Sequence, residues 1–169
     1  GSFMQRGEPA FLDKWLRARL AVENGVDLVL ELPAAFSLRS AEFFARGAVQ
    51  LLAATGVVEK LSCGAESPST NFVELAKLVT SPAFNESLQS FLNTGCTYAA
   101  AYEKALQTLD GAAKLNSPND ILALEYCKAL QNTSITPLFI QRKQANYNDT
   151  SINGVIASAT AIRRACVEN

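Results

Sequence analysis

The stretch VVEKLSCG, residues 57–64, decides the fold class, because it has the character of a short strand buried on both faces. It breaks into a polar loop, GAESPST. Two similar apolar runs accompany it along the chain, DLVLELP at residues 27–33 and ITPLFIQR at residues 135–142. Helical patterns separate the three runs. Such alternation predicts an α/β fold with a parallel sheet flanked by helices.

Apolar periodicity predicts helices between and around these strands. The motif SPND at residues 117–120 is a strong helix start. Ser117 can cap, Pro118 fits the first helical position, and Asp120 supplies the acid of a capping box. A first helix is predicted from Pro9 to Gly25, with an apolar stripe of Phe11, Trp15, Ala18 and Val22. Further helices are predicted from about 38 to 54 and from near Ser158. Residues 70–109 are also predicted to be helical, with breaks at Ser81-Pro82 and at 93–95.

The amino-acid composition excludes several classes of catalytic and binding site. The chain has 169 residues, which most simply make one domain, and 49% of them are apolar. With 15 Lys and Arg against 16 Asp and Glu, the net charge of −1 produces no strong field that would attract nucleic acid or a membrane. The sequence holds no histidine, so a Ser-His-Asp triad, a Cys-His dyad and a His-ligated metal are excluded from this chain. Neither a G-x-G-x-x-G fingerprint nor a P-loop motif occurs.

Four cysteines, Cys63, Cys96, Cys127 and Cys166, lie too far apart in sequence for a metal knuckle or a redox motif. We predict that they are buried, reduced thiols of a cytosolic protein. No signal peptide opens the sequence and no apolar run is long enough to span a bilayer, so a cytoplasmic protein without membrane contact is expected.

Ligands of parallel α/β sheets bind at the carboxyl ends of the strands, which directs attention to three polar segments. Gly64 would let a ligand approach the backbone closely, although the pattern alone favours a plain turn glycine. Asn119 could pair with a base edge or a ribose, whereas helix capping needs only its neighbours. Arg142 follows the last predicted strand, where a charge is ordinary but could also meet a phosphate or stack on a base.

Two further segments have the character of anion sites. Ser158 and Thr160 open the last predicted helix and Arg163 follows one turn later, so hydroxyls, helix dipole and guanidinium could converge on a phosphate. A serine cap on a basic amphipathic helix is the alternative. Gln5 and Arg6 lie beside a glycine ahead of the first helix, where an anion could be held, but the pattern alone favours an exposed loop.

Taken together, these sites resemble one family. The [ST]-x-[ST]-x-x-R helix start at residues 158–163 resembles the second signature of the nucleotidyltransferase superfamily, which includes adenylyltransferases and class I tRNA synthetases. The segment SFMQRGEPAFLDKWLRARLAVENGVDLVLELP resembles the part that follows the first strand–helix unit of bacterial tRNA(Met) cytidine acetate ligases. The pieces FARGAVQLLAATGVVEKLSCGAES, LNSPNDILALEYCKAL, FIQRKQANYND and IASATAIRRA follow in that family's order.

The resemblance implies a Rossmann-like nucleotidyltransferase core and a reaction. ATP and acetate would form an acetyl-adenylate with loss of pyrophosphate, and the acetyl group would pass to N4 of the wobble cytidine of elongator tRNA(Met). Mg²⁺ is expected to accompany the ATP. The implied roles are ATP contact for Gly64, Asn119 and Arg142, phosphate contact for Ser158, Thr160 and Arg163, and unassigned membership of the site for Gln5, Arg6, Lys14 and Arg17.

Two departures from the family pattern matter. The family's H-x-G-H motif, whose histidines stabilise the triphosphate, is absent, and Tyr147-Asn148-Asp149 stands where the family usually has Tyr-His-Asp. We therefore predict a single, incomplete nucleotidyltransferase-like domain over residues 1–169 that lacks the first strand–helix unit and has little ligase activity. The alternatives are a small-molecule adenylyltransferase of the same superfamily and a non-catalytic nucleotide- or RNA-binding module.

Overall fold

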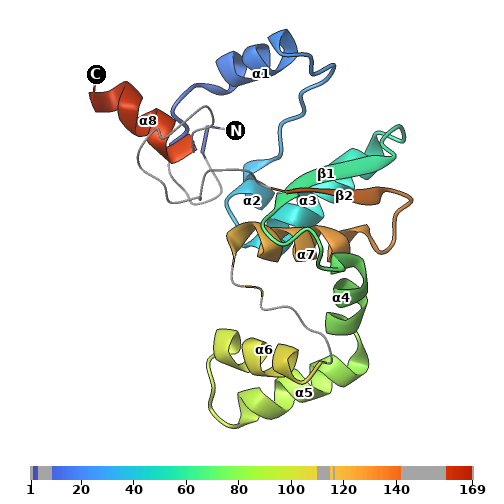
Figure 1. Cartoon of the computed structure of the whole chain (residues 1–169). Helices are drawn as coiled ribbons and strands as arrows, with labels where there is room; N and C mark the ends of the chain where they lie inside the picture. The colour runs from blue at the N-terminus through green and yellow to red at the C-terminus, as the bar shows by residue number, and fades with distance from the viewer. Residues whose placement is uncertain (1, 4–8, 110–114, 116, 142–158, 169) are drawn as a thin grey trace.

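A computed structural model of the chain describes residues 2–3, 9–109, 115, 117–141 and 159–168 (Figure 1). Within them, two strands alternate with helices in the predicted order. The elements are α1 (Lys14–Glu23), α2 (Ala34–Ser37), α3 (Ala41–Ala54), β1 (Lys60–Ala65), α4 (Phe72–Val79), α5 (Pro82–Asn93), α6 (Tyr98–Gln107), α7 (Pro118–Leu130), β2 (Thr136–Gln141) and α8 (Ala159–Glu168).

The two strands pair in parallel, as predicted. The register runs from Lys60 opposite Thr136 to Ala65 opposite Gln141. Parallel strands need a crossover connection, and α4 to α7 supply it between them. The carboxyl ends of both strands therefore lie at the same edge of the sheet, beside the first turn of α7.

One core cluster joins the sheet to the helices that cover it. Val49 of α3, Leu61 of β1, Leu130 of α7 and Ile135 are buried together. A second cluster is centred on α4 to α7 and reaches the sheet through the Phe72 and Phe139 rings, whose centroids lie 5.0 Å apart. The end of β1 and the start of α7 are thus fixed by packing from both sides.

Several predicted helix boundaries are confirmed. Ser81 caps α5 by accepting from the Phe84 N–H at 3.2 Å, and Pro82 is the first helical residue, so the predicted break lies where the sequence places it. Gly25 follows the end of α1 with φ 94°, and Gly95 follows α5 with φ 83°. Both conformations are left-handed, which glycine adopts without a steric penalty.

The prediction of a buried strand at residues 27–33 is wrong. This segment has no strand pairing in the described residues, and Leu28 and Leu30 are 64% and 41% exposed. A buried parallel strand requires hydrogen-bonded neighbours, whereas β1 pairs only with β2 in the described part of the chain. The alternating leucines instead lie along one side of an apolar groove.

Two smaller expectations are corrected at the amino end. Pro9 does not open a helix, because it bridges to Phe3, and α1 begins at Lys14 with Asp13 as its cap. The predicted apolar stripe of α1 is not part of the core, since Trp15 is 75% exposed.

All four cysteines are free, but only Cys127 is buried and Cys166 is exposed, which corrects the prediction of four buried thiols. None of the helices described is long and apolar enough to cross a membrane.

Candidate functional site

The loop after β1 is tied to the first turn of α7 by a buried carboxylate. Asp120 is only 3% exposed, and its Oδ1 accepts hydrogen bonds from the backbone N–H groups of Glu66 at 2.9 Å and Ser67 at 3.1 Å. A buried charge is tolerated when it is hydrogen-bonded, and a carboxylate can accept two N–H donors on one oxygen. Asp120 therefore fixes the backbone that directly follows Gly64 and Ala65.

The side chain of Glu66 is held in the same place by two donors from α7. The Ser117 hydroxyl donates to Oε2 at 2.6 Å, and the Asn119 amide donates to Oε1 at 2.6 Å. Ser117 Oγ also accepts from the Asp120 N–H at 3.1 Å. These hydrogen bonds form a closed network between the loop after β1 and the start of α7, which we call the β1–α7 clasp. Its members are Glu66, Ser67, Ser117, Asn119 and Asp120.

The clasp gives the SPND motif a second role. Ser117 caps α7 as predicted, and Pro118 is the first helical residue. The Asp120 carboxylate, however, reaches across to the β1 loop rather than serving only as the acid of a local capping box. Asn119, which capping left unexplained, donates to Glu66.

No sequence pattern predicts a role for Glu66. The one signal in the sequence is its position two residues beyond Gly64, after the end of a predicted strand.

The structure brings together two of the predicted site residues. Gly64 lies near the carboxyl end of β1, exposed and opposite Ile140, and Asn119 lies in the clasp that follows it. Arg163 lies half-buried in α8, and Thr160 falls in the first turn of the same helix. Arg142, Ser158, Gln5 and Arg6 lie outside the described residues.

Lys14 and Arg17 are not part of the clasp. Both lie on α1, which Figure 1 shows apart from β1 and α7. Lys14 forms an ion pair with Glu31 at 2.8 Å, and this hydrogen bond is the main reason that the pKa of Glu31 lies below its ordinary value. Arg17 contributes to the lowered pKa of Asp13, after the backbone N–H groups of Leu16 and Trp15.

Electrostatically, the clasp is an acceptor site. It combines the carboxylates of Glu66 and Asp120 with neutral polar groups and contains no cation. An anionic phosphate would be repelled there, whereas hydroxyl or amino donors of a neutral group would be attracted. No group of three or more His, Cys, Asp or Glu side chains that could hold a metal ion occurs in the part of the chain described.

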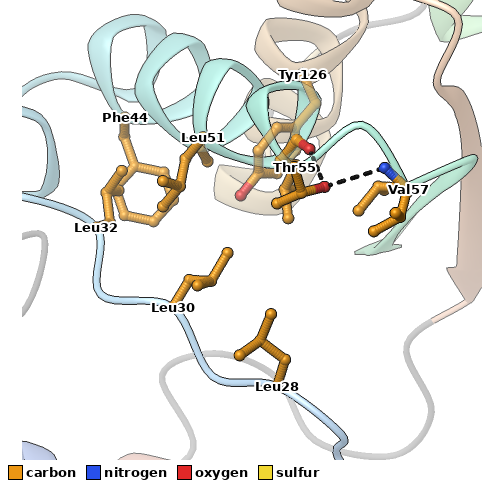
Figure 2. Close-up of a pocket in the computed structure, with 11 residues that line it drawn as sticks. Leu28, Leu30, Leu32, Phe44, Leu51, Thr55, Val57 and Tyr126 are labelled. Carbon is orange, nitrogen blue, oxygen red and sulfur yellow. Dashed lines mark hydrogen bonds between the residues drawn. The ribbon is translucent and has the colours of Figure 1, made fainter.

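An apolar groove of about 420 Å³ lies between α3 and residues 28–32, in the segment predicted as a strand. Figure 2 shows Leu28, Leu30 and Leu32 along that segment and Phe44 and Leu51 projecting from α3. The remaining lining residues are Ala48, Leu52, Thr55, Val57, Val58 and Tyr126.

A parallel sheet covered by helices, with polar groups gathered where β1 ends, is typical of a Rossmann-like nucleotide-binding fold. The chain matches the HIGH Nucleotidyl Transferase family model over residues 1–169 and belongs to that family.

Curated relatives narrow the comparison. The chain is 43% identical over 173 residues to the tRNA(Met) cytidine acetate ligase of Clostridium novyi, covering 96% of this chain and 43% of that protein. It is 46% identical over 169 residues to the ligase of the same name from Leuconostoc mesenteroides, covering 98% and 42%. The chain therefore spans less than half the length of these relatives.

Solved structures agree. The apo form I of Thermotoga maritima TmcAL matches 99% of this chain and 43% of its own, with a TM-score of 0.90 and 36% identity. TmcAL from the same organism bound with alpha-thio ATP matches with a TM-score of 0.85 and 36% identity, over 99% of this chain and 42% of its own. The Rossmann-like fold class predicted from the sequence is confirmed.

Proposed function

We propose that this chain is the nucleotide-binding core of an ATP-dependent ligase that activates acetate as acetyl-adenylate and acetylates N4 of the wobble cytidine of elongator tRNA(Met). The observation that carries the proposal is the likeness of nearly the whole chain to a TmcAL structure bound with alpha-thio ATP. The clasp at the carboxyl end of β1 adds local support, because ligands of parallel sheets bind at that edge.

In this proposal Gly64, Asn119 and Arg142 contact ATP, while Ser158, Thr160 and Arg163 face its phosphates. Gln5, Arg6, Lys14 and Arg17 remain candidates for further contacts. The repulsion between the clasp carboxylates and a triphosphate supports a division of the site into a nucleoside end at the clasp and a phosphate end near the arginines. Catalysis then consists of positioning and charge stabilisation, which arginines, hydroxyls and N–H groups can supply.

Mg²⁺ and the cellular setting belong to the same proposal. The part of the chain described offers no group of three His, Cys, Asp or Glu side chains that could hold a metal ion. Mg²⁺ often binds through substrate phosphates with few protein ligands, so we assign it to the triphosphate and name no carboxylate for it. The reaction takes place in the cytoplasm, where its tRNA is found.

The test uses the intact natural protein with ATP, acetate and tRNA(Met). We expect acetate-dependent release of pyrophosphate and N4-acetylcytidine in the tRNA, detected by mass spectrometry of its nucleosides. Pyrophosphate release with another small acid or alcohol, and no acetylated cytidine, would establish the small-molecule adenylyltransferase instead. ATP binding without any release would establish a binding module.

We also propose that residues 1–169 form one nucleotidyltransferase-like domain that an additional apolar strand completes in the groove beside Leu28, Leu30 and Leu32. Two observations support this occupant. The described edge of β1 away from β2 has no strand partner, and the groove is lined by three alternating leucines and by Val57 and Val58, which precede β1. A strand inserted there would pair with backbone on both sides and bury its own apolar side chains.

Hydrogen exchange can show whether a further strand pairs with the free edge of β1. In the intact natural protein, we expect the N–H groups of β1 that do not bond to β2 to exchange at least tenfold more slowly than in the 169-residue chain. Equal exchange in the two proteins would mean that no strand adds to β1. Ligase activity of the 169-residue chain alone would show that the chain needs no such strand.

A further inference from the structure

We propose that Glu66 selects a ribonucleotide, by accepting hydrogen bonds from the vicinal 2′ and 3′ hydroxyls of the sugar. The inference rests on the proposed ATP-dependent function and names a specificity-determining residue for it. Its basis is the β1–α7 clasp, in which Glu66 is exposed and yet held at both carboxylate oxygens.

The first argument is the number of acceptor positions. An ionised carboxylate has about four lone-pair positions, and in the clasp Ser117 occupies one on Oε2 while Asn119 occupies one on Oε1. Each oxygen therefore keeps capacity for one further donor. Two adjacent acceptor atoms match two adjacent hydroxyls, a pattern that carboxylates use for ribose in other nucleotide-binding sheets.

The second argument is charge. Asp120 lies behind Glu66 and adds a second carboxylate, and its acceptor oxygen is occupied by the N–H groups of Glu66 and Ser67. Phosphates are repelled by this pair, so the part of a nucleotide that fits here is neutral and carries donors. In ATP those donors are the ribose hydroxyls and the adenine amino group. The amino group carries both donors on one nitrogen, whereas the hydroxyls present one donor to each carboxylate oxygen.

The third argument is preorganisation. An exposed glutamate ordinarily loses rotamer freedom when it binds a ligand. Glu66 has already lost that freedom, because Asp120 fixes its backbone and two α7 side chains fix its carboxylate. Gly64, exposed at the end of the same strand, adds no side chain between the strand and the sugar. The clasp is therefore a prepared acceptor for the sugar.

The test compares ATP with 2′-deoxy-ATP, 3′-deoxy-ATP and inosine triphosphate, measured by calorimetry on the intact natural protein. Because a hydrogen bond to a charged group is strong, removing either hydroxyl should weaken binding by about tenfold to a hundredfold. Inosine triphosphate, which keeps both hydroxyls and lacks the amino group, should lose no affinity through Glu66. The substitution Glu66→Gln should weaken ATP and bring the ATP to 2′-deoxy-ATP ratio close to one.

Glu59→Gln is the matched control, because Glu59 is an exposed carboxylate at the opposite end of β1. It should preserve the wild-type preference. If ATP binds but the deoxynucleotides bind equally well, or if Glu66→Gln keeps the preference, the inference is wrong while the proposed function stands. If ATP itself does not bind, the proposed function fails. If Glu66→Gln does not fold, equal binding of ATP and 2′-deoxy-ATP by the wild-type protein still overturns the inference.

Discussion

Replacement of Asp120 by alanine removes the acceptor that fixes the loop after β1. Two backbone N–H groups, those of Glu66 and Ser67, then lose a charged partner. Hydrogen bonds to charged groups contribute about 1.5–3 kcal/mol each. Because water can reach the half-buried loop and replace part of this, we expect Asp120→Ala to lower the free energy of unfolding by about 2–4 kcal/mol. Asp120→Asn, which keeps a neutral acceptor, should cost about half as much.

Urea unfolding followed by circular dichroism measures these values in the 169-residue chain. Asp27→Ala is the matched control, because Asp27 is exposed and should cost no more than about 0.5 kcal/mol. For a chain of this size, the Asp120→Ala loss corresponds to a fall in Tm of about 4–16 °C. Unfolding of Asp120→Ala at the same urea concentration as Asp27→Ala, with an unchanged slope, would refute the view that Asp120 holds the loop.

Three further outcomes follow from the packing and from the thiols. Gly47→Ala should destabilise the chain by about 1–3 kcal/mol in urea despite its better helix propensity, because the new Cβ would lie 2.6 Å from Phe36 Cβ; adding Phe36→Ala should restore part of the loss. Leu124→Ala, at a site 2% exposed, should cost about 2–5 kcal/mol, whereas Leu28→Ala on the groove should cost less than about 1 kcal/mol. Cys96 should be alkylated by iodoacetamide at lower pH than Cys127: the Thr94 hydroxyl and the Lys104 ammonium lower the pKa of Cys96, so more thiolate is present at a given pH, while burial raises the pKa of Cys127 to about 12. In mass-spectrometric mapping, Lys104→Gln should move the Cys96 profile to higher pH, and an unmoved profile would contradict the role of the ammonium.

The elements that local sequence specifies were predictable. Ser81-Pro82 and Ser117-Pro118 start helices because a hydroxyl cap and a proline act within one turn, and both starts are found in the structure. The parallel pairing of β1 with β2 was also predictable, because helices separate the two apolar runs. The helix starts depend only on neighbouring residues, and the parallel pairing follows from the helices that connect the two strands.

The clasp and the state of residues 27–33 were not predictable in the same way. Asp120 satisfies the pattern of a capping box, and nothing local reveals that its carboxylate bonds to N–H groups 53 and 54 residues away. Residues 27–33 have the apolar character of a strand, but strand pairing depends on a hydrogen-bonded neighbour that periodicity does not report. The partner of Asp120 lies far away along the chain, and no partner strand for residues 27–33 occurs among the described residues.

The absence of histidine and the construction of the clasp lead to the same view of what this chain contributes. Without a histidine in the sequence, the groups at the end of β1 include no imidazole that could serve as a general base. The donors of Ser117 and Asn119 are directed to Glu66, and Asp120 is directed to backbone. Such groups hold a ligand in place rather than exchange protons with it. Variants of the clasp should therefore change nucleotide affinity and KM more than the pH dependence of the rate.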